Sequence, residues 1–111
     1  VSPQTASATL SVKNMSDIDT ITVVNGDEGL DVTNVTDMTT TYVLDGVTAN
    51  KTVEVQYVTT STEGSADETT VTVADSGSTA NDTTFLISDA TNGTSTSTIE
   101  TVNVVMAGTT K

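Results

Sequence analysis

The sequence predicts an all-β fold built from a short unit that is repeated four times. Three observations support this prediction: the repetition itself, an alternation of threonine with valine, and the absence of any helical periodicity. The copies run from Asp17 to Gly26, Asp37 to Gly46, Asp67 to Gly77 and Thr98 to Gly108, and their starts are 20, 30 and 31 residues apart. Self-similarity at such periods is typical of stacked repeat proteins.

The alignment of the four copies predicts which face of each strand is buried. One column holds Thr20, Thr40, Thr70 and Thr101, and three residues later a second column holds Val23, Val43, Val73 and Val104. Side chains three residues apart in a strand lie on opposite faces. The valine face also contains Ile21, Thr41, Val71 and Val102, and we expect it to form the core. The threonine face continues with Thr22, Tyr42, Thr72 and Asn103, which are expected to point outward.

About eight strands follow from the β-branched runs along the chain. Their expected positions are residues 8–12, 19–25, 30–35, 40–45, 51–58, 68–74, 84–88 and 99–106. Clusters of Asn, Asp, Gly and Ser separate them, for example at residues 25–29, 61–66 and 76–82. Such clusters mark turns between strands.

Two architectures satisfy this pattern for residues 1–111, which we expect to form a single β module. In a stacked, parallel β-solenoid-like module, each repeat is one coil and matched residues form ladders. In an antiparallel β-sandwich the eight strands form two facing sheets, and the repeats record ancestry without stacking. The agreement between columns favours the solenoid, whereas the uneven spacing of the copies favours the sandwich.

Composition and charge exclude several classes of function. The chain has 111 residues and a net charge of −12, with 15 acidic residues, three lysines and no arginine. Nucleic acid binding requires a basic surface, so we expect no nucleic acid partner. No apolar run reaches the roughly 20 residues that span a bilayer, so direct membrane insertion is not expected. His and Cys are also absent, which removes imidazole and thiol chemistry and predicts that the protein is not an enzyme.

Calcium is the one cofactor that the residue types favour. Stacked repeats would bring equivalent acidic residues to about 4.8 Å from one another, where like charges repel and a divalent cation would stabilise them. The turn residues Asn25, Asp45 and Asp75 are expected to align in this way, and Asn25, Asp27, Glu28 and Asp31 form the densest single cluster. The six expected ligands are therefore Asn25, Asp27, Glu28, Asp31, Asp45 and Asp75.

Two strings extend the interpretation to a family. Residues 66–73 (ADETTVTV) and 99–104 (IETVNV) resemble strands of bacterial surface-layer proteins and of secreted adhesins of the repeats-in-toxin type. The resemblance implies an extracellular module at the cell surface, often exported by a type I pathway and often calcium-dependent. The glycine-rich nonapeptide of the calcium β-roll, GGxGxDxUx, does not occur in this chain.

Three functions are compatible with these observations. The first is a structural module of a surface layer or surface-attached adhesin, which associates with itself or with neighbouring modules through β edges and acidic loops. The second is a module that binds a carbohydrate or a receptor, such as a cell-surface glycan, with Tyr42 and Tyr57 as a stacking face. The third is ice binding by outward threonine pairs such as Thr20 with Thr22 and Thr70 with Thr72.

Overall fold

The computed structural model describes residues 7–89 and 99–108, and these residues form an all-β structure of two four-stranded sheets. The first sheet contains β1 (Ala8–Ser11), β3 (Leu30–Val35), β5 (Thr52–Tyr57) and β7 (Thr84–Asp89), in that order. The second contains β2 (Thr20–Val24), β4 (Thr41–Asp45), β6 (Glu68–Ala74) and β8 (Thr101–Ala107). One short 3₁₀ turn, η1 (Thr59–Ser61), follows β5. The eight strands agree with the expected positions to within two residues at each end.

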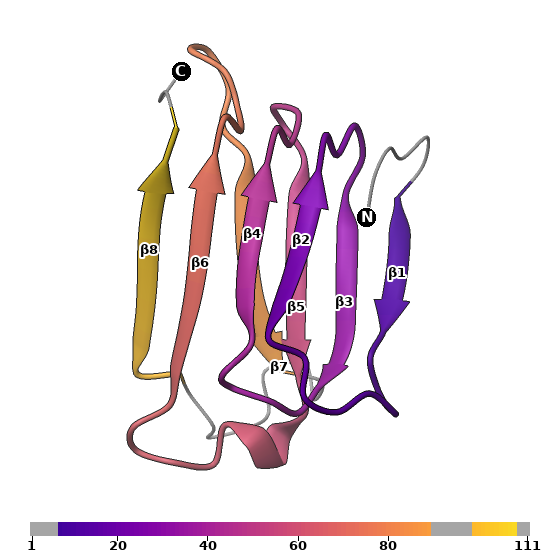
Figure 1. The fold of residues 1–111 in the computed structure, drawn as a ribbon, viewed down its shortest axis with the longest axis vertical. Helices are drawn as coiled ribbons and strands as arrows, with labels where there is room; N and C mark the ends of the chain where they lie inside the picture. Colours follow the sequence, from indigo (N-terminus) through magenta and orange to yellow (C-terminus); the bar gives the residue numbers. More distant parts are fainter. Residues whose placement is uncertain (1–6, 90–98, 109–111) are drawn as a thin grey trace.

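The chain alternates between the two sheets, so that consecutive strands never pair with each other. Every pairing instead joins a strand to the next but one along the chain, and every pairing is parallel. Figure 1 shows the odd strands running in one direction and the even strands in the other, with the two sheets face to face. The antiparallel sandwich is therefore wrong as a description of strand pairing.

The core lies between the two sheets and is mostly aliphatic, with two buried tyrosines, Tyr42 and Tyr57. Inward positions alternate along each strand, as in β5, where every second residue is buried. The buried apolar side chains are Val12, Ile21, Val23, Leu30, Val32, Val35, Tyr42, Leu44, Val47, Val53, Val55, Tyr57 and Val71. These side chains form one continuous cluster, because each row of the ladder packs on the row before it. The hydrophobic effect of this burial stabilises the stack.

The second repeat is shifted by one residue from its expected alignment. Thr20 pairs with Thr41 and not with Thr40, and Thr41 pairs in turn with Thr70. Because side chains alternate between faces, a shift of one residue exchanges inward for outward positions throughout that strand. Tyr42 is consequently in the core and only 1% exposed, whereas Val43 lies on the outer face.

The four aligned valines do not share one environment, and this part of the prediction is wrong. Val23 is buried and Val73 packs against the core, as expected. Val43 points outward because of the shift in register. Val104 lies on the inward face of β8 beside Val71, yet 59% of its surface is exposed. Thr40 is buried and donates its hydroxyl proton to the carbonyl oxygen of Ile18 at 2.8 Å.

Candidate functional site

A column of left-handed residues follows the strands of the second sheet and forms one corner of the molecule. Asn25, Gly46, Asp75 and Gly108 come directly after β2, β4, β6 and β8, with φ of 49°, 69°, 48° and 79°. Asn, Asp and Gly are the residues that adopt this conformation at least cost. Backbone hydrogen bonds join the column to the adjacent strands, from Asn25 N–H to Asp45 O (2.8 Å) and from Gly46 N–H to Ala74 O (3.0 Å). We call these four residues the turn column.

Side chains and glycines alternate along the turn column. A Cβ at Gly46 would come within 2.7 Å of Asn25 Oδ1, and a Cβ at Gly108 would come within 3.3 Å of Asp75 Oδ2. Each glycine therefore leaves room for the side chain of the preceding member of the column. Alignment of the repeats predicted Asp45 at the same position as Asn25 and Asp75, but the structure has Gly46 there and adds Gly108 to the column. The shared glycine at the end of each repeat was the signal for them.

Three of the six expected calcium ligands line one groove beside the turn column. The groove has a volume of about 650 Å³, and its walls include Asn25, Asp45 and Asp75 together with residues 46–49, Gly77 and Ser78. Asp45 lies one residue before the column, because it pairs with Val24 and Ala74. Two carboxylates and one amide thus border the same space, which is a small set of oxygen ligands for a calcium ion.

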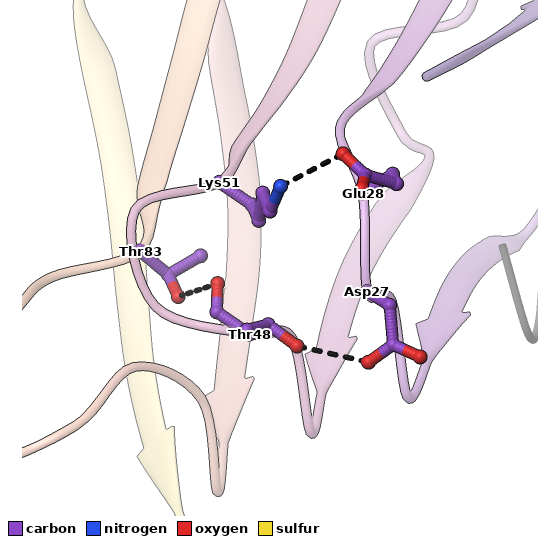
Figure 2. Close-up of polar contacts among 5 residues, drawn as sticks. All are labelled: Asp27, Glu28, Thr48, Lys51 and Thr83. Atoms are coloured by element: carbon purple, nitrogen blue, oxygen red, sulfur yellow. Dashed lines mark hydrogen bonds and ion pairs between the residues drawn. The ribbon is translucent and has the colours of Figure 1, made fainter. Parts of the chain in front are cut away.

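The other three expected ligands, Asp27, Glu28 and Asp31, are not among the residues that line this groove. Asp27 Oδ1 accepts a hydrogen bond from Thr48 Oγ1 at 3.0 Å, and Glu28 Oε2 forms an ion pair with Lys51 Nζ at 2.7 Å (Figure 2). These contacts tie the β2–β3 turn to the β4–β5 turn. Thr83 extends the link to the start of β7 by donating its hydroxyl proton to Thr48 O at 3.3 Å. Asp27 and Glu28 therefore connect successive turns, and Lys51 partly compensates the charge of Glu28.

Asp31 lies on the outer face of β3 and is separated from both groups. Its neighbour in register on β5 is Glu54, so two carboxylates occupy adjacent positions of the first sheet. Glu54 Oε1 accepts hydrogen bonds from Ser88 Oγ (2.6 Å) and Gln56 Nε2 (3.2 Å). Within residues 7–89 and 99–108, no group of three or more acidic side chains lies close enough together to hold a metal ion. The cluster of Asn25, Asp27, Glu28 and Asp31 that we expected is not assembled as a unit.

Both tyrosines are buried, so the expected stacking face for a sugar is wrong. Tyr42 and Tyr57 are 1% and 0% exposed, and the Tyr42 ring packs against Phe85 with ring centroids 5.7 Å apart. Tyr57 Oη and Thr69 Oγ1 form a buried hydrogen bond of 2.9 Å. The Tyr42 hydroxyl is buried without a hydrogen-bond partner of normal geometry. Burial and the neighbouring Tyr57 hydroxyl raise the pKa of Tyr42 far above its usual range, so the phenol stays neutral.

The outer face of the second sheet carries rows of threonine and valine. One row contains Thr20, Thr41, Thr70 and Asn103, and the next contains Thr22, Val43, Thr72 and Val105. Tyr42 does not interrupt these rows, because it points to the core. The shift in register therefore makes this face more regular than the sequence alignment suggested.

The inward face of β8 is exposed. Val102, Val104 and Met106 are 44%, 59% and 61% exposed, although their neighbours in register on β6 are Thr69, Val71 and Val73. In Figure 1, β8 lies beyond β7 at one end of the molecule. Apolar side chains are thus present at core positions that no described strand covers. Large exposed apolar patches of this kind often mark interaction sites.

No protein family, curated protein or solved structure was found to match this chain. Among the described residues, no helix is long and apolar enough to cross a membrane. The geometry of the two sheets, the turn column and the exposed end is therefore the basis for the proposed function.

Proposed function

We propose that this chain is a non-enzymatic structural module of a bacterial surface layer or surface-attached adhesin, located outside the cell, and that its two sheets form a short parallel β-solenoid. The observation that carries the proposal is the strict alternation of the chain between two sheets whose strands pair only in parallel. Each odd strand and the even strand after it then form one coil. Such coils make a rigid rod that can be lengthened by further coils.

The chemistry of the exposed surface is consistent with a structural role for this rod. Fifteen acidic residues against three lysines keep the exposed surface hydrated and strongly negative. The side chains that could stack on a ligand are instead used in the core, where Tyr42 packs on Phe85. What remains exposed is backbone edge, acidic turn and the apolar end at β8, which are surfaces for contact with other protein modules.

Calcium binding is proposed as part of this function, at the groove bordered by Asn25, Asp45 and Asp75. Bound calcium would neutralise two carboxylates on neighbouring strands and so stabilise the corner of the stack. Few ligands are present, so we expect weak binding, with a dissociation constant of about 10⁻⁴–10⁻³ M, as in extracellular calcium modules. The chain then unfolds at a higher temperature in calcium, and the Asp75→Asn variant loses this shift.

Differential scanning calorimetry and sedimentation velocity test the two halves of the proposal. The wild-type chain is expected to associate as its concentration rises and to melt at a higher temperature with 5 mM calcium than with a chelator. Asp31→Asn serves as the control for the loss of one charge outside the groove. A strict monomer whose melting temperature ignores calcium would contradict the proposal.

The threonine rows on the second sheet favour ice binding as a second candidate function. Neighbouring strands lie about 4.8 Å apart and alternate residues about 6.7 Å apart along a strand, so Thr20, Thr41 and Thr70 with Thr22 and Thr72 form a regular grid of hydroxyl and methyl groups. A regular grid can hold water molecules in a fixed arrangement. Thermal hysteresis in a freezing assay, abolished by Thr41→Lys, would support this candidate, and its absence in the wild-type chain would exclude it.

A further inference from the structure

The two ends of the molecule have complementary shapes. Figure 1 shows β8 extending beyond β7 at one end and β1 extending beyond β2 at the other. The overhanging strands belong to opposite sheets, since β1 is the edge of the first sheet and β8 is the edge of the second. If a second copy follows the first along the stack, its β1 lies beside β7 and faces the exposed side of β8. The overhanging β1 of one copy can therefore occupy the open position beside β7 of the other, opposite the overhanging β8.

The inward side chains at these ends also fit together. β8 offers Val104 and Met106, which are 59% and 61% exposed. β1 offers Ala8 and Leu10 on its inward face, since their neighbours in register are the buried Leu30 and Val32. Ala8 and Leu10 are only partly buried. Contact between these two faces would continue the core across the boundary between copies.

The backbone hydrogen-bond pattern supports this head-to-tail arrangement. Inside the molecule, outward residues donate to the preceding strand, as from Thr41 N–H to Asp19 O (2.9 Å) and from Thr84 N–H to Lys51 O (2.9 Å). Inward residues donate to the following strand, as from Val12 N–H to Thr33 O (3.0 Å). Because N–H groups alternate in direction along a parallel strand, Val104 N–H on β8 points toward a following strand. Thr9 N–H on β1 points toward a preceding strand, so the two ends repeat the internal pattern.

Three of the four edge strands lack the charged residues that usually protect an exposed edge. Each interior strand carries an acidic residue, namely Asp31, Asp45, Glu54 and Glu68. Of the four edge strands, β1, β2 and β8 contain no charged residue, whereas β7 has one acidic residue, Asp89, at its last position. Proteins generally protect exposed edges with charges or proline, and like charges on adjacent strands repel. An edge that lacks both is suited to pairing with another strand.

We propose that the β7–β8 end of one copy binds the β1–β2 end of a second copy, with β1 of the second copy parallel to β7 and β2 parallel to β8. This inference rests on the structural function proposed above and adds the polarity of assembly. The same surfaces remain available on the outer copies, so the contact is heterologous and produces open filaments. The turn column also continues, because Gly108 would be followed by Asn25 of the second copy, as Gly46 is followed by Asp75.

Two variants that block opposite ends provide the test. Val104→Lys places a charge on the exposed inward face of β8, and Asn103→Lys is its control with the same charge on the outward face. Thr9→Pro removes an N–H that points away from β3 and leaves the β1–β3 ladder intact, with Thr9→Val as its control. Thr20→Pro, at the edge of β2, is a second variant for the same end. Circular dichroism and melting temperature establish that each variant is folded before sedimentation.

Sedimentation velocity of each variant alone and of mixtures distinguishes the arrangements. We expect wild type and both controls to form a growing series of oligomers. The association constants of Val104→Lys alone and of Thr9→Pro alone should each be at least tenfold lower than that of the wild type. An equimolar mixture of the two variants should form a dimer and no larger oligomer. A dimer of Thr9→Pro alone would show that two β7–β8 ends meet, which overturns the polarity and leaves the structural function standing. Wild-type chains that stay monomeric would overturn both.

Discussion

The side chain of Asn25 occupies the space above Gly46, where a Cβ would approach Asn25 Oδ1 to 2.7 Å. Both residues adopt left-handed backbone conformations, with φ of 49° and 69°. The two residues follow paired strands, β2 and β4, and Asn25 N–H donates a hydrogen bond of 2.8 Å to the carbonyl oxygen of Asp45, the residue before Gly46. The turn column therefore depends on the alternation of Asn or Asp with glycine, because each glycine leaves space for the preceding side chain.

Gly46→Ala is expected to destabilise the protein more than Gly108→Ala. Both substitutions place alanine in a left-handed conformation, which costs about 1–3 kcal/mol. Only Gly46→Ala adds a contact at 2.7 Å, since the nearest side-chain atom at Gly108 is 3.3 Å away. Urea unfolding of the two variants measures the difference. The double variant Asn25→Gly with Gly46→Ala should lack the part of the destabilisation that comes from the contact with Asn25 Oδ1. Equal losses of stability in Gly46→Ala and Gly108→Ala would contradict this account.

Tyr42→Phe is expected to leave stability unchanged or raise it by up to about 1 kcal/mol, because the buried hydroxyl that it removes has no partner of normal geometry. Tyr57→Phe removes the same group from a position that forms a 2.9 Å hydrogen bond with buried Thr69. That variant should lose about 1–3 kcal/mol. Both variants remove one buried tyrosine hydroxyl, so they differ only in whether that hydroxyl has a hydrogen-bond partner. A larger loss of stability for Tyr42→Phe than for Tyr57→Phe would contradict the hydrogen bonding described for these two hydroxyls.

Leu44→Ala tests the corrected register of the second repeat. Leu44 is 1% exposed, and truncation of a fully buried leucine costs about 2–5 kcal/mol. Leu86 lies on the outer face of β7 and is 44% exposed, so Leu86→Ala should cost less than about 1 kcal/mol. Guanidinium unfolding of both variants gives the comparison. If Leu86→Ala were the more damaging change, the assignment of inward and outward faces would be incorrect.

Asp37 provides a prediction for acid pH. Hydrogen bonds from the Thr39 hydroxyl (2.6 Å) and the Thr39 N–H (2.8 Å) hold the pKa of Asp37 below its usual value. The unfolded chain therefore binds the proton more readily, so the contribution to stability is present at neutral pH and is lost as pH falls through the folded pKa. The Thr39→Val variant keeps the carboxylate of Asp37 and its hydrogen bond from the Thr39 N–H, but removes the hydrogen bond from the Thr39 hydroxyl. We expect wild type and Thr39→Val to differ in unfolding free energy at neutral pH by at most about 1 kcal/mol, because the site is accessible to solvent. This difference should disappear below the pKa of Asp37 in the folded protein. A difference that stays constant with pH would contradict the proposed cause.

The number, type and position of the strands could be predicted from the sequence, but the register of one repeat could not. Residues 41–44 (TYVL) are β-favouring at every position, so the alternation of this segment does not distinguish its two faces. The structure buries Tyr42 because its ring fills space beside Phe85, a long-range packing effect that repeat alignment does not contain. In the fourth repeat the error is two residues, since Thr70 pairs with Asn103, and the faces are preserved.

The candidate site could be predicted only in part for the same reason. Asn25 and Asp75 align as expected, but the shift in register puts Gly46 in the turn column and moves Asp45 one position before it. Asp27 and Glu28 are engaged with Thr48 and Lys51, contacts between residues more than 20 positions apart in the sequence. The exposure of β8 also depends on the stagger of the two sheets, which has no signature in a single strand.

Nuclear Overhauser contacts among the methyl groups of Val23, Leu44 and Val73 test the central claim most directly. These three residues form one inward row across β2, β4 and β6. A parallel stack predicts methyl contacts from Val23 to Leu44 and from Leu44 to Val73, with none between Val43 and Val23. Strong Hα–Hα contacts between these strands, which are typical of antiparallel pairs, would contradict the two parallel sheets and the stacking function argued from them.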